Sequence, residues 1–233
     1  YDTVTTMAGG ENIVNTAINS FGKIDILVNN AGILRDRMVF NMTEEEWDGV
    51  IATHLKGCFT TARAATPYMR QQKSGRIICL TSDSARGNIG QVNYSAAKAG
   101  ILGFVRTVAK DIAKYGATCN AVAPAAITRM TSDLDSQRPP SVQQASGEGS
   151  GDPNTGGPEA IAPAICYLAT DAAQFINGQV IGINAGRVSL WVNPGPLQSA
   201  FNAKGVWTVE ELIEKVPDTI AWNQVTQPTD LNI

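Results

Sequence analysis

The sequence predicts an α/β fold in which helices cover both faces of a parallel sheet, the arrangement described as doubly wound. Short apolar runs at residues 24–28, 76–80 and 118–123 lack the alternation of a half-exposed strand. Such continuous runs are typical of strands that are buried on both faces. Segments with the apolar spacing of helices lie between them. With 233 residues, 43% apolar and 17% charged, the chain is long enough for one core of this kind.

Start and stop signals support the individual elements. A capping box over residues 43–46 starts a long helix, which we expect to bend near Gly57 and Pro67. Gly22 and Gly116 are the expected stops of two other helices. In chain order, the predicted elements are helices at 10–21, 43–72, 93–114, 158–168 and 208–216, and strands at 24–28, 76–80, 118–123 and 179–183.

Tyr94 is the first candidate reactive group, because it precedes Lys98 by four residues in the predicted helix 93–114. Residues at this spacing project from the same face of a helix. A free tyrosine titrates at about pH 10, and a neighbouring ammonium stabilises the phenolate. We therefore expect Tyr94 to act as a general base closer to neutral pH. The alternative is that the pair lies on a solvated helix face.

Polar residues at the ends of two predicted strands favour a reactive site. Residues 29–32 follow the strand at 24–28, and Ser82 follows the strand at 76–80. In open parallel sheets, ligands bind beyond the carboxyl ends of the strands. We therefore expect residues 29–32, Ser82 and Tyr94 to share one crevice.

Four motifs occur in order along the chain: Asn29-Asn30-Ala31-Gly32, Thr81-Ser82, Tyr94-x-x-x-Lys98 and Asn120-Ala121-Val122-Ala123-Pro124. In these motifs and their spacing, residues 1–186 resemble the short-chain dehydrogenase/reductase family. The resemblance implies a Rossmann-like sheet and an NAD(P)-dependent oxidoreductase that interconverts a secondary alcohol and a ketone.

A narrower resemblance is to the (3R)-hydroxyacyl-CoA dehydrogenase region of peroxisomal multifunctional enzymes and their bacterial relatives. It is carried by residues 1–4, 31–37, 54–57 and 123–131. It implies a (3R)-hydroxyacyl-CoA type thioester as the favoured substrate and NAD as the cofactor, with NADP not excluded. Two alternatives stay open. One is an NADPH-dependent reductase of a 3-oxoacyl thioester or a steroid, and the other is a non-catalytic interaction protein.

The resemblance assigns three catalytic roles. Tyr94 exchanges a proton with the substrate oxygen, Lys98 lowers the pKa of Tyr94 and binds the nicotinamide ribose, and Ser82 holds the same substrate oxygen. Ser82 lies one residue closer to Tyr94 than the usual serine of the family. Thr81 and Ser84 therefore stay open as alternatives.

His54 takes the position where family members often carry an asparagine that supports a proton-relay water. An imidazole can also bind a water, so His54 is a candidate catalytic residue, and a packed structural histidine is the alternative. Ala125 replaces a glycine that is common in the family. The cofactor contacts implied by the resemblance are Asp2, Asn29, Ala31, Gly32, Tyr94, Lys98, Pro124, Ile127 and Thr128.

The N-terminal part of the expected fold is missing from the sequence. No glycine-rich turn of the dinucleotide-binding kind precedes Asp2, whereas such a turn holds the cofactor pyrophosphate in a dinucleotide fold. We therefore expect the chain to lack the first β-α-β segment of a longer protein and to begin near the end of the third strand. The strand at 24–28 would then have an unpaired apolar edge.

Residues 1–186 are thus predicted to form one incomplete dinucleotide-binding domain. The run 131–158 is rich in Ser, Gln, Gly and Pro and is expected to be a flexible loop, either a substrate lid or a tolerated insertion. Residues 187–233 form a C-terminal extension, with a short helix whose capping signal begins at Thr208.

Composition excludes several classes of function. A net charge of −3 and a pI of about 5.2 argue against a nucleic-acid partner. No window reaches the roughly 20 apolar residues that a membrane span needs. Four scattered cysteines predict buried thiols in a reducing compartment, and a single histidine excludes a multi-histidine metal site. We expect a cytoplasmic protein, peroxisomal if eukaryotic, that forms a homodimer or homotetramer through the helices at 43–72 and 93–114.

Overall fold

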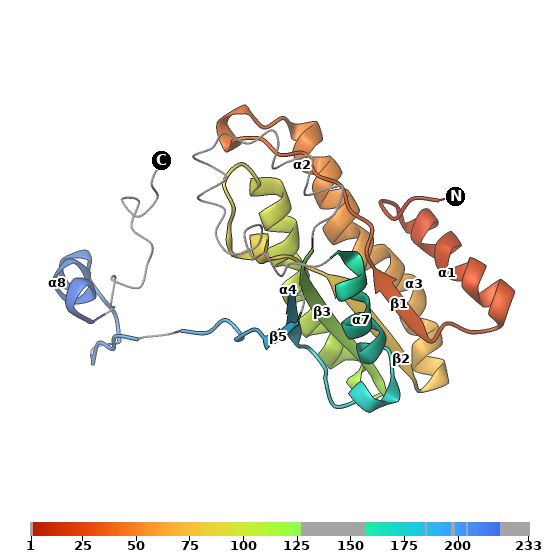
Figure 1. Ribbon diagram of the computed structural model, residues 1–233. Coiled ribbons are helices and arrows are strands. Elements are labelled where there is room, and N and C mark those ends of the chain that lie inside the picture. The colour runs from red at the N-terminus through yellow and green to blue at the C-terminus, as the bar shows by residue number, and fades with distance from the viewer. Residues whose placement is uncertain (1, 127–156, 185, 197–198, 204, 220–233) are drawn as a thin grey trace. The chain divides into compact units, whose positions relative to one another are not determined.

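The computed structural model describes residues 2–126, 157–184, 186–196, 199–203 and 205–219 (Figure 1). The chain divides into two compact units, Tyr1–Trp191 and Val192–Ile233. The first unit therefore extends five residues beyond the predicted boundary at 186. The expected loop at 131–158 lies outside the described residues except for its last two positions.

A five-stranded sheet forms the centre of the first unit. Its order is β1-β2-β3-β4-β5, with the first four strands parallel and β5 antiparallel to β4. The strands are β1 (Ile26–Asn29), β2 (Gly75–Leu80), β3 (Ala117–Ala125), β4 (Val180–Asn184) and β5 (Arg187–Leu190). The predicted parallel sheet is confirmed. The prediction that residues 179–183 form the last strand is wrong, because β5 follows; its Arg-Val-Ser-Leu sequence is short and mostly exposed, unlike a buried strand.

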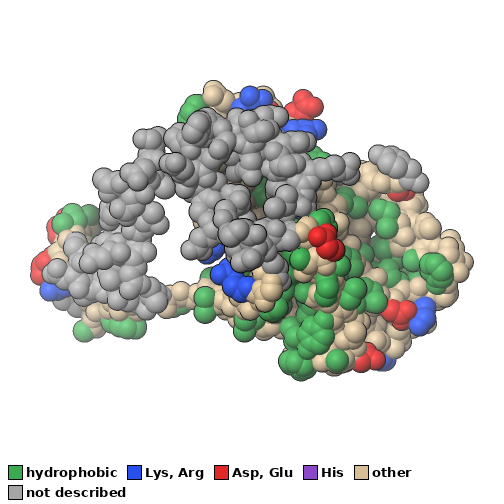
Figure 2. Space-filling model, in the orientation of Figure 1, with side chains coloured by type: hydrophobic (Ala, Val, Ile, Leu, Met, Phe, Trp, Pro, Cys, Tyr) green, Lys and Arg blue, Asp and Glu red, His purple; other side chains and the backbone are tan. Residues whose placement is uncertain are grey.

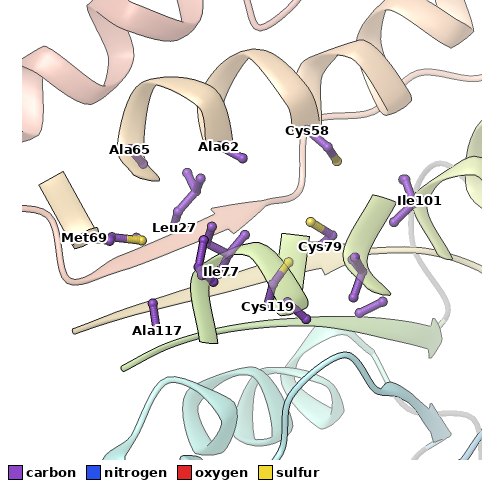
Figure 3. Packing of buried hydrophobic residues seen from close by; sticks show 14 of the residues in the cluster. Leu27, Cys58, Ala62, Ala65, Met69, Ile77, Cys79, Ile101, Ala117 and Cys119 are labelled. Carbon is purple, nitrogen blue, oxygen red and sulfur yellow. The ribbon is translucent and has the colours of Figure 1, made fainter. Parts of the chain in front are cut away.

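Alternate residues of β2 face two different helical layers. Ile77 and Cys79 belong to the core cluster formed with α3 (Gly57–Gln72) and α4 (Val92–Ala113). Figure 3 shows Cys79 in this layer, with Cys58 of α3 and Cys119 of β3 close by. Ile78 and Leu80 face the opposite side, where α7 (Ala162–Leu168) packs. Both faces of the sheet are covered, which explains why the run at 76–80 does not alternate.

The two sides of the sheet differ in their surface. Three of the four cysteines, Cys58, Cys79 and Cys119, are buried as predicted, whereas Cys166 on α7 is exposed. Hydrophobic side chains gather over α7 and the segment that follows it in the view of Figure 2, and Tyr167 and Phe175 are exposed there. The α7 side thus carries exposed apolar side chains.

Helix α1 (Met7–Phe21) forms an outer layer on α3. Thr6 caps its start, and Gly22 ends it with a positive φ of 75°, as predicted. A Cβ atom on Gly10 would lie 2.8 Å from the backbone carbon of Thr60, so the absence of a side chain permits this close helix crossing.

Strand β1 is the edge of the described sheet, because it pairs only with β2. Ile26 and Val28 are 45% and 40% exposed on this strand. The predicted unpaired apolar edge is therefore present. Asp2 does not end a strand, because residues 2–4 adopt coil and turn conformations ahead of α1.

The predicted helix at 43–72 consists of three segments. The capping box of Thr43 and Glu46 starts α2 (Glu44–Ile51), as predicted. A π-helical turn, Ala52–Lys56, then leads into α3. The irregularity therefore lies just ahead of Gly57, and Pro67 is accommodated inside α3. A π turn places one extra residue in a helical turn, and here that turn carries His54.

Two further helices differ in detail from the prediction. The helix expected at 158–168 is a short 3-10 segment, Pro158–Ala160, followed by α7. In the second unit, α8 (Val209–Thr219) begins with a reciprocal capping box between Thr208 and Glu211. This start agrees with the predicted signal.

Candidate active site

Ser82 and Tyr94 meet at the carboxyl end of β2. Ser82 lies two residues beyond the end of the strand, and Tyr94 lies in the first turn of α4. The Ser82 side chain is close enough to the Tyr94 phenol to lower the pKa of that phenol. Residues distant in the sequence are thus brought together as predicted, because parallel strands deliver their carboxyl ends to one edge of the sheet.

The three candidate hydroxyl groups have different partners. Thr81 is buried, and its Oγ1 donates to the carbonyl oxygen of Lys98 at 2.9 Å. The Oγ of Ser84 donates to Oε1 of Gln91 at 3.0 Å. The Oγ of Ser82 accepts the backbone N–H of Ser84 at 3.2 Å and faces Tyr94. Ser82 is therefore the candidate whose hydroxyl points at the phenol.

Burial raises the pKa of Tyr94 above its ordinary value. The Ser82 side chain lowers this pKa, and the negative charge of Asp36 raises it. The net direction is opposite to the sequence prediction, in which the ammonium of Lys98 lowers the pKa of Tyr94. In the structure, Nζ of Lys98 lies 5.3 Å from the centroid of the Tyr94 ring and donates to the carbonyl oxygen of Leu80 at 2.6 Å. The ammonium is therefore directed at the strand end.

Lys98 is buried, and burial lowers its pKa to about 8. The nearby thiols of Cys58 and Cys79 act in the opposite direction. An ammonium has three N–H donors, and the contact with Leu80 uses one of them. Within the described residues, Lys98 thus has donors for a ligand that carries hydroxyl groups, such as a ribose.

His54 lies between the Tyr94 ring and the loop after β1. Its Nε2 is 2.8 Å from the carbonyl oxygen of Ile33 and 3.1 Å from the backbone nitrogen of the same residue. The imidazole meets the Tyr94 ring edge to face at 5.1 Å. Burial, and then the charge of Lys98, lower the pKa of His54 to about 4 despite the bond to Ile33. His54 is therefore neutral at pH 7.

Gly32 is the residue that lets the loop rest on this imidazole. A Cβ atom on Gly32 would lie 2.5 Å from Cε1 of His54, which is far inside van der Waals contact. Nδ1 of His54 is buried and has no hydrogen-bond partner among the described residues. Both sequence interpretations of His54 keep support: Nε2 has the backbone partner of a packed histidine, and Nδ1 could bind a water.

A cleft of about 90 Å³ opens beside the end of β1. Of the predicted cofactor contacts, Asn29 and Ala31 line it. The Asn29 side chain is engaged by the protein, because its Oδ1 accepts from Thr61 at 2.7 Å and its Nδ2 lies 3.5 Å from Sγ of Cys79. The complete lining is Val4, Ile13, Leu27, Val28, Asn29, Asn30, Ala31, Thr53, His54, Gly57, Cys58 and Thr61.

The other predicted cofactor residues that the structure describes do not line this cleft. Asp2 is exposed, and its carboxylate accepts from Asn12 and from the backbone of Thr3, which lowers its pKa. Pro124 lies near the end of β3 and pairs with β4. Ile127 and Thr128 lie outside the described residues.

Two polar residues that the sequence argument did not single out adjoin the site. Gln91 is buried, and its Nε2 donates to Oδ2 of Asp36 at 2.7 Å. The available signal was the position of Gln91 three residues before Tyr94, at the start of the predicted helix. A single glutamine in a turn gives no indication of burial, so this signal was weak.

The described part of the chain has neither a cluster of metal ligands nor a membrane-spanning helix. It contains no group of three or more His, Cys, Asp or Glu side chains that could hold a metal ion. None of its helices is long and apolar enough to cross a membrane.

Known proteins share this sequence pattern. A sequence profile described as enoyl-(acyl carrier protein) reductase matches residues 3–187. A 3-oxoacyl-[acyl-carrier-protein] reductase of Synechocystis is 45% identical over 181 residues, which cover 76% of this chain and 70% of that protein. A short-chain type dehydrogenase/reductase of Mycobacterium tuberculosis is 41% identical over 199 residues, 84% of this chain and 65% of that protein.

The peroxisomal hydratase-dehydrogenase-epimerase of Saccharomyces cerevisiae is 44% identical over 178 residues, 76% of this chain and 18% of that protein. The chain thus spans less than two thirds of the length of the mycobacterial and yeast relatives. A solved structure, a short chain dehydrogenase from Mycobacterium avium, matches with a TM-score of 0.76 at 35% identity, over 91% of this chain and 69% of that chain. The extent of the profile match, the identities and the shared fold agree: the chain belongs to the short-chain dehydrogenase/reductase family.

Proposed function

We propose that the chain is part of an NAD(P)-dependent oxidoreductase that interconverts the secondary alcohol and the ketone of a 3-hydroxyacyl thioester, with (3R)-hydroxyacyl-CoA as the favoured substrate. One observation carries the proposal: the side chains of Ser82 and Tyr94 lie together beyond a strand end, with the buried Lys98 one helical turn away. This is the arrangement that proton exchange with a single substrate oxygen requires.

The residues present fit a nicotinamide cofactor. The unused N–H donors of Lys98 suit ribose hydroxyls, and Asn29 and Ala31 line a cleft at the carboxyl end of β1. When bound, the nicotinamide supplies or takes up the hydride. We assign the remaining predicted contacts, Asp2, Gly32, Pro124, Ile127 and Thr128, to the same cofactor as part of this proposal.

Tyr94 transfers the proton, and Ser82 binds the substrate oxygen. In alcohol oxidation, the phenolate of Tyr94 accepts the hydroxyl proton of the substrate, and in reduction the phenol returns a proton to the carbonyl oxygen. Ser82 donates a hydrogen bond to that oxygen in both directions. Because burial raises the pKa of Tyr94, the isolated phenol favours the protonated form, and the positive charge of Lys98 favours proton release when both groups face the ligand.

A reductase working with NADPH on a 3-oxoacyl thioester is the second candidate. The 45% identity to a 3-oxoacyl-[acyl-carrier-protein] reductase supports it, and the dehydrogenase candidate is supported by the 44% identity to a peroxisomal hydratase-dehydrogenase-epimerase. Both candidates interconvert a secondary alcohol and a ketone on an acyl thioester. They differ in the group that carries the acyl chain and in the nicotinamide nucleotide. The third alternative, a cofactor-free interaction protein, predicts no saturable tryptophan quenching by NADH.

We also propose a homodimer or homotetramer formed through the helical segments at 43–72 (α2, the π turn and α3) and through α4; Phe59 of α3 is 48% exposed. The proposed location is the cytoplasm, or the peroxisome in a eukaryote. The small-molecule thioester is the proposed substrate partner.

The test is turnover by the protein that contains this chain. NADH formation from (3R)-3-hydroxyacyl-CoA, and NADPH consumption with a 3-oxoacyl thioester, are measured for the wild type, Tyr94→Phe and Tyr68→Phe. Tyr68 is the matched control, because its hydroxyl contacts only Asn15, at 3.4 Å, among the described residues. We expect Tyr94→Phe to lose roughly 10²- to 10⁴-fold in kcat and Tyr68→Phe to keep its rate. Equal rates for all three proteins would contradict the assignment of Tyr94.

A further inference from the structure

Gln91 joins three segments that surround the Ser82 and Tyr94 pair. Its Nε2 donates to Oδ2 of Asp36, in the loop after β1, at 2.7 Å. Its Oε1 accepts from Oγ of Ser84 at 3.0 Å and from Nδ2 of Asn88 at 2.9 Å. The side chain is 4% exposed, so these bonds form away from bulk water, where an unmade bond is costly.

Backbone contacts hold the same two loops together. The backbone nitrogen of Arg37 donates to the carbonyl oxygen of Gly90 at 2.7 Å. An isolated parallel bridge also pairs Arg37 with Gln91. The side-chain contact between Asp36 and Gln91 therefore lies on a backbone that is already fixed.

The carboxylate of Asp36 determines which way the Gln91 amide points. A carboxylate can only accept hydrogen bonds, so the amide nitrogen must face Asp36. The amide oxygen must then face Ser84 and Asn88. As a consequence, the Ser84 hydroxyl donates its proton to Gln91 and is not available to donate to a substrate oxygen.

This network reaches the reactive pair directly. The backbone N–H of Ser84 donates to Oγ of Ser82 at 3.2 Å, and the Ser82 side chain lies beside the Tyr94 phenol, whose pKa it lowers. We propose that Asp36 and Gln91 are positioning residues, which orient Ser84. As a result Ser82, and not Ser84, donates a hydrogen bond to the substrate oxygen beside Tyr94. This inference rests on the function proposed above, and it adds residues to which that function assigns no role.

The charge of Asp36 adds a property that can be measured without turnover. Three other side chains face Tyr94: Ser82 after β2, His54 on the π turn, and Lys98 one turn further along the same helix, α4. His54 is neutral at pH 7. Asp36 thus supplies the negative charge that raises the pKa of the phenol.

The first experiment is a spectroscopic titration of Tyr94 in the protein that contains this chain. The phenolate absorbance of Tyr94 is obtained as the difference between each protein and the same protein carrying Tyr94→Phe. We expect Asp36→Asn to lower the apparent pKa of Tyr94, because a negative charge is removed. We expect Gln91→Leu to raise it, because the carboxylate loses the N–H that partly neutralises it. Asp83→Asn is the matched control, since Asp83 pairs with the exposed Arg86.

The second experiment is a double-mutant cycle on kcat. We expect Gln91→Leu to lower kcat roughly 10- to 100-fold through misplacement of the reactive pair, with KM for the nucleotide unchanged. If Gln91 acts through Ser84, adding Ser84→Ala to Gln91→Leu lowers kcat by less than a further twofold. This limit of about twofold is the usual precision of such cycles. Asp83→Asn should keep the wild-type kcat and pH profile.

The outcomes separate this inference from the proposed function. A Tyr94 titration that is the same in Asp36→Asn and Asp83→Asn, or multiplicative effects in the cycle, would overturn the positioning role, even if Tyr94→Phe is inactive and the function stands. A wild type that turns over no 3-hydroxyacyl thioester, with opposite titration shifts in Asp36→Asn and Gln91→Leu, would reject the function and support the positioning network.

Discussion

Individual residues in this site are defined by their hydrogen-bond partners more than by their types. Thr81, Ser82 and Ser84 all carry a hydroxyl near Tyr94, yet Thr81 is bonded to the backbone of Lys98 and Ser84 to Gln91. Ser82 is the one whose side chain lowers the pKa of the phenol. Whether each hydroxyl donates or accepts a hydrogen bond depends on its neighbours. The Ser84 hydroxyl, for example, donates to Gln91 because the carboxylate of Asp36, in another loop, fixes the Gln91 amide.

His54 gives a prediction at the residue scale, because it is the single histidine of the chain and its pKa is about 4 in the folded state. In the unfolded state it titrates at about 6.5. Between these values the unfolded chain binds more protons, so the contribution of His54 to stability is complete above about pH 6.5 and is lost as the pH falls toward 4. We expect a loss of about 2 kcal/mol between pH 7.5 and pH 5.

The measurement is urea unfolding at both pH values for the wild type and for His54→Gln, which does not titrate. The free-energy difference between the two proteins should shrink, or reverse in favour of the variant, at pH 5. Carboxylates contribute equally to both proteins and cancel in this comparison. If the two proteins differ in unfolding free energy by the same amount at both pH values, the pKa of His54 is not lowered in the folded state, and the prediction is wrong.

Close packing of the π turn and of helix α1 determines the shape of the site. The π turn at Ala52–Lys56 places His54 beneath the loop after β1, and α1 packs on α3 through Gly10. Thr60, opposite Gly10, also donates to the carbonyl oxygen of Val4 at 2.6 Å. The segment that carries Val4 thus lines the cleft because α1 lies close to α3.

A pair of helix glycines tests this close packing. In Gly10→Ala the new Cβ would lie 2.8 Å from the backbone of Thr60, so α1 must move, and we expect a destabilisation of about 1–3 kcal/mol. Gly103, inside α4, has nothing within 4 Å of its added Cβ. Gly103→Ala should therefore stabilise the fold by about 0.5–1 kcal/mol through helix propensity. Urea midpoints for both variants test the pair, and two shifts of the same sign would refute the packing argument.

For the molecule as a whole, the sequence predicted the features that depend on local pattern. Continuous apolar runs predicted β1, β2 and β3, and the capping box at Thr43 marked the start of α2. The exposed edge at Ile26 and Val28 was predicted from the strand order of the expected fold. These features are encoded in periodicity and turn chemistry, which a single sequence displays directly.

The remaining features depend on tertiary contacts and could not be predicted in the same way. The pKa of Tyr94 is raised by burial among elements distant in the sequence, and the direction of the Lys98 ammonium is set by a carbonyl at the end of β2. The role of Gln91 depends on Asp36 in another loop. Strand β5 was missed because its mostly exposed residues lack a buried pattern.

Ser82 and Tyr94 are proposed to hydrogen-bond one substrate oxygen, while Lys98 binds the nucleotide. The decisive experiment is a crystal structure of the protein that contains this chain, bound to its nicotinamide nucleotide and a 3-oxoacyl thioester. We expect the 3-oxo oxygen at hydrogen-bond distance, about 3 Å, from both Oγ of Ser82 and Oη of Tyr94, with Nζ of Lys98 on the nucleotide ribose. A 3-oxo group bound away from both hydroxyls would refute the proposed roles of Ser82 and Tyr94.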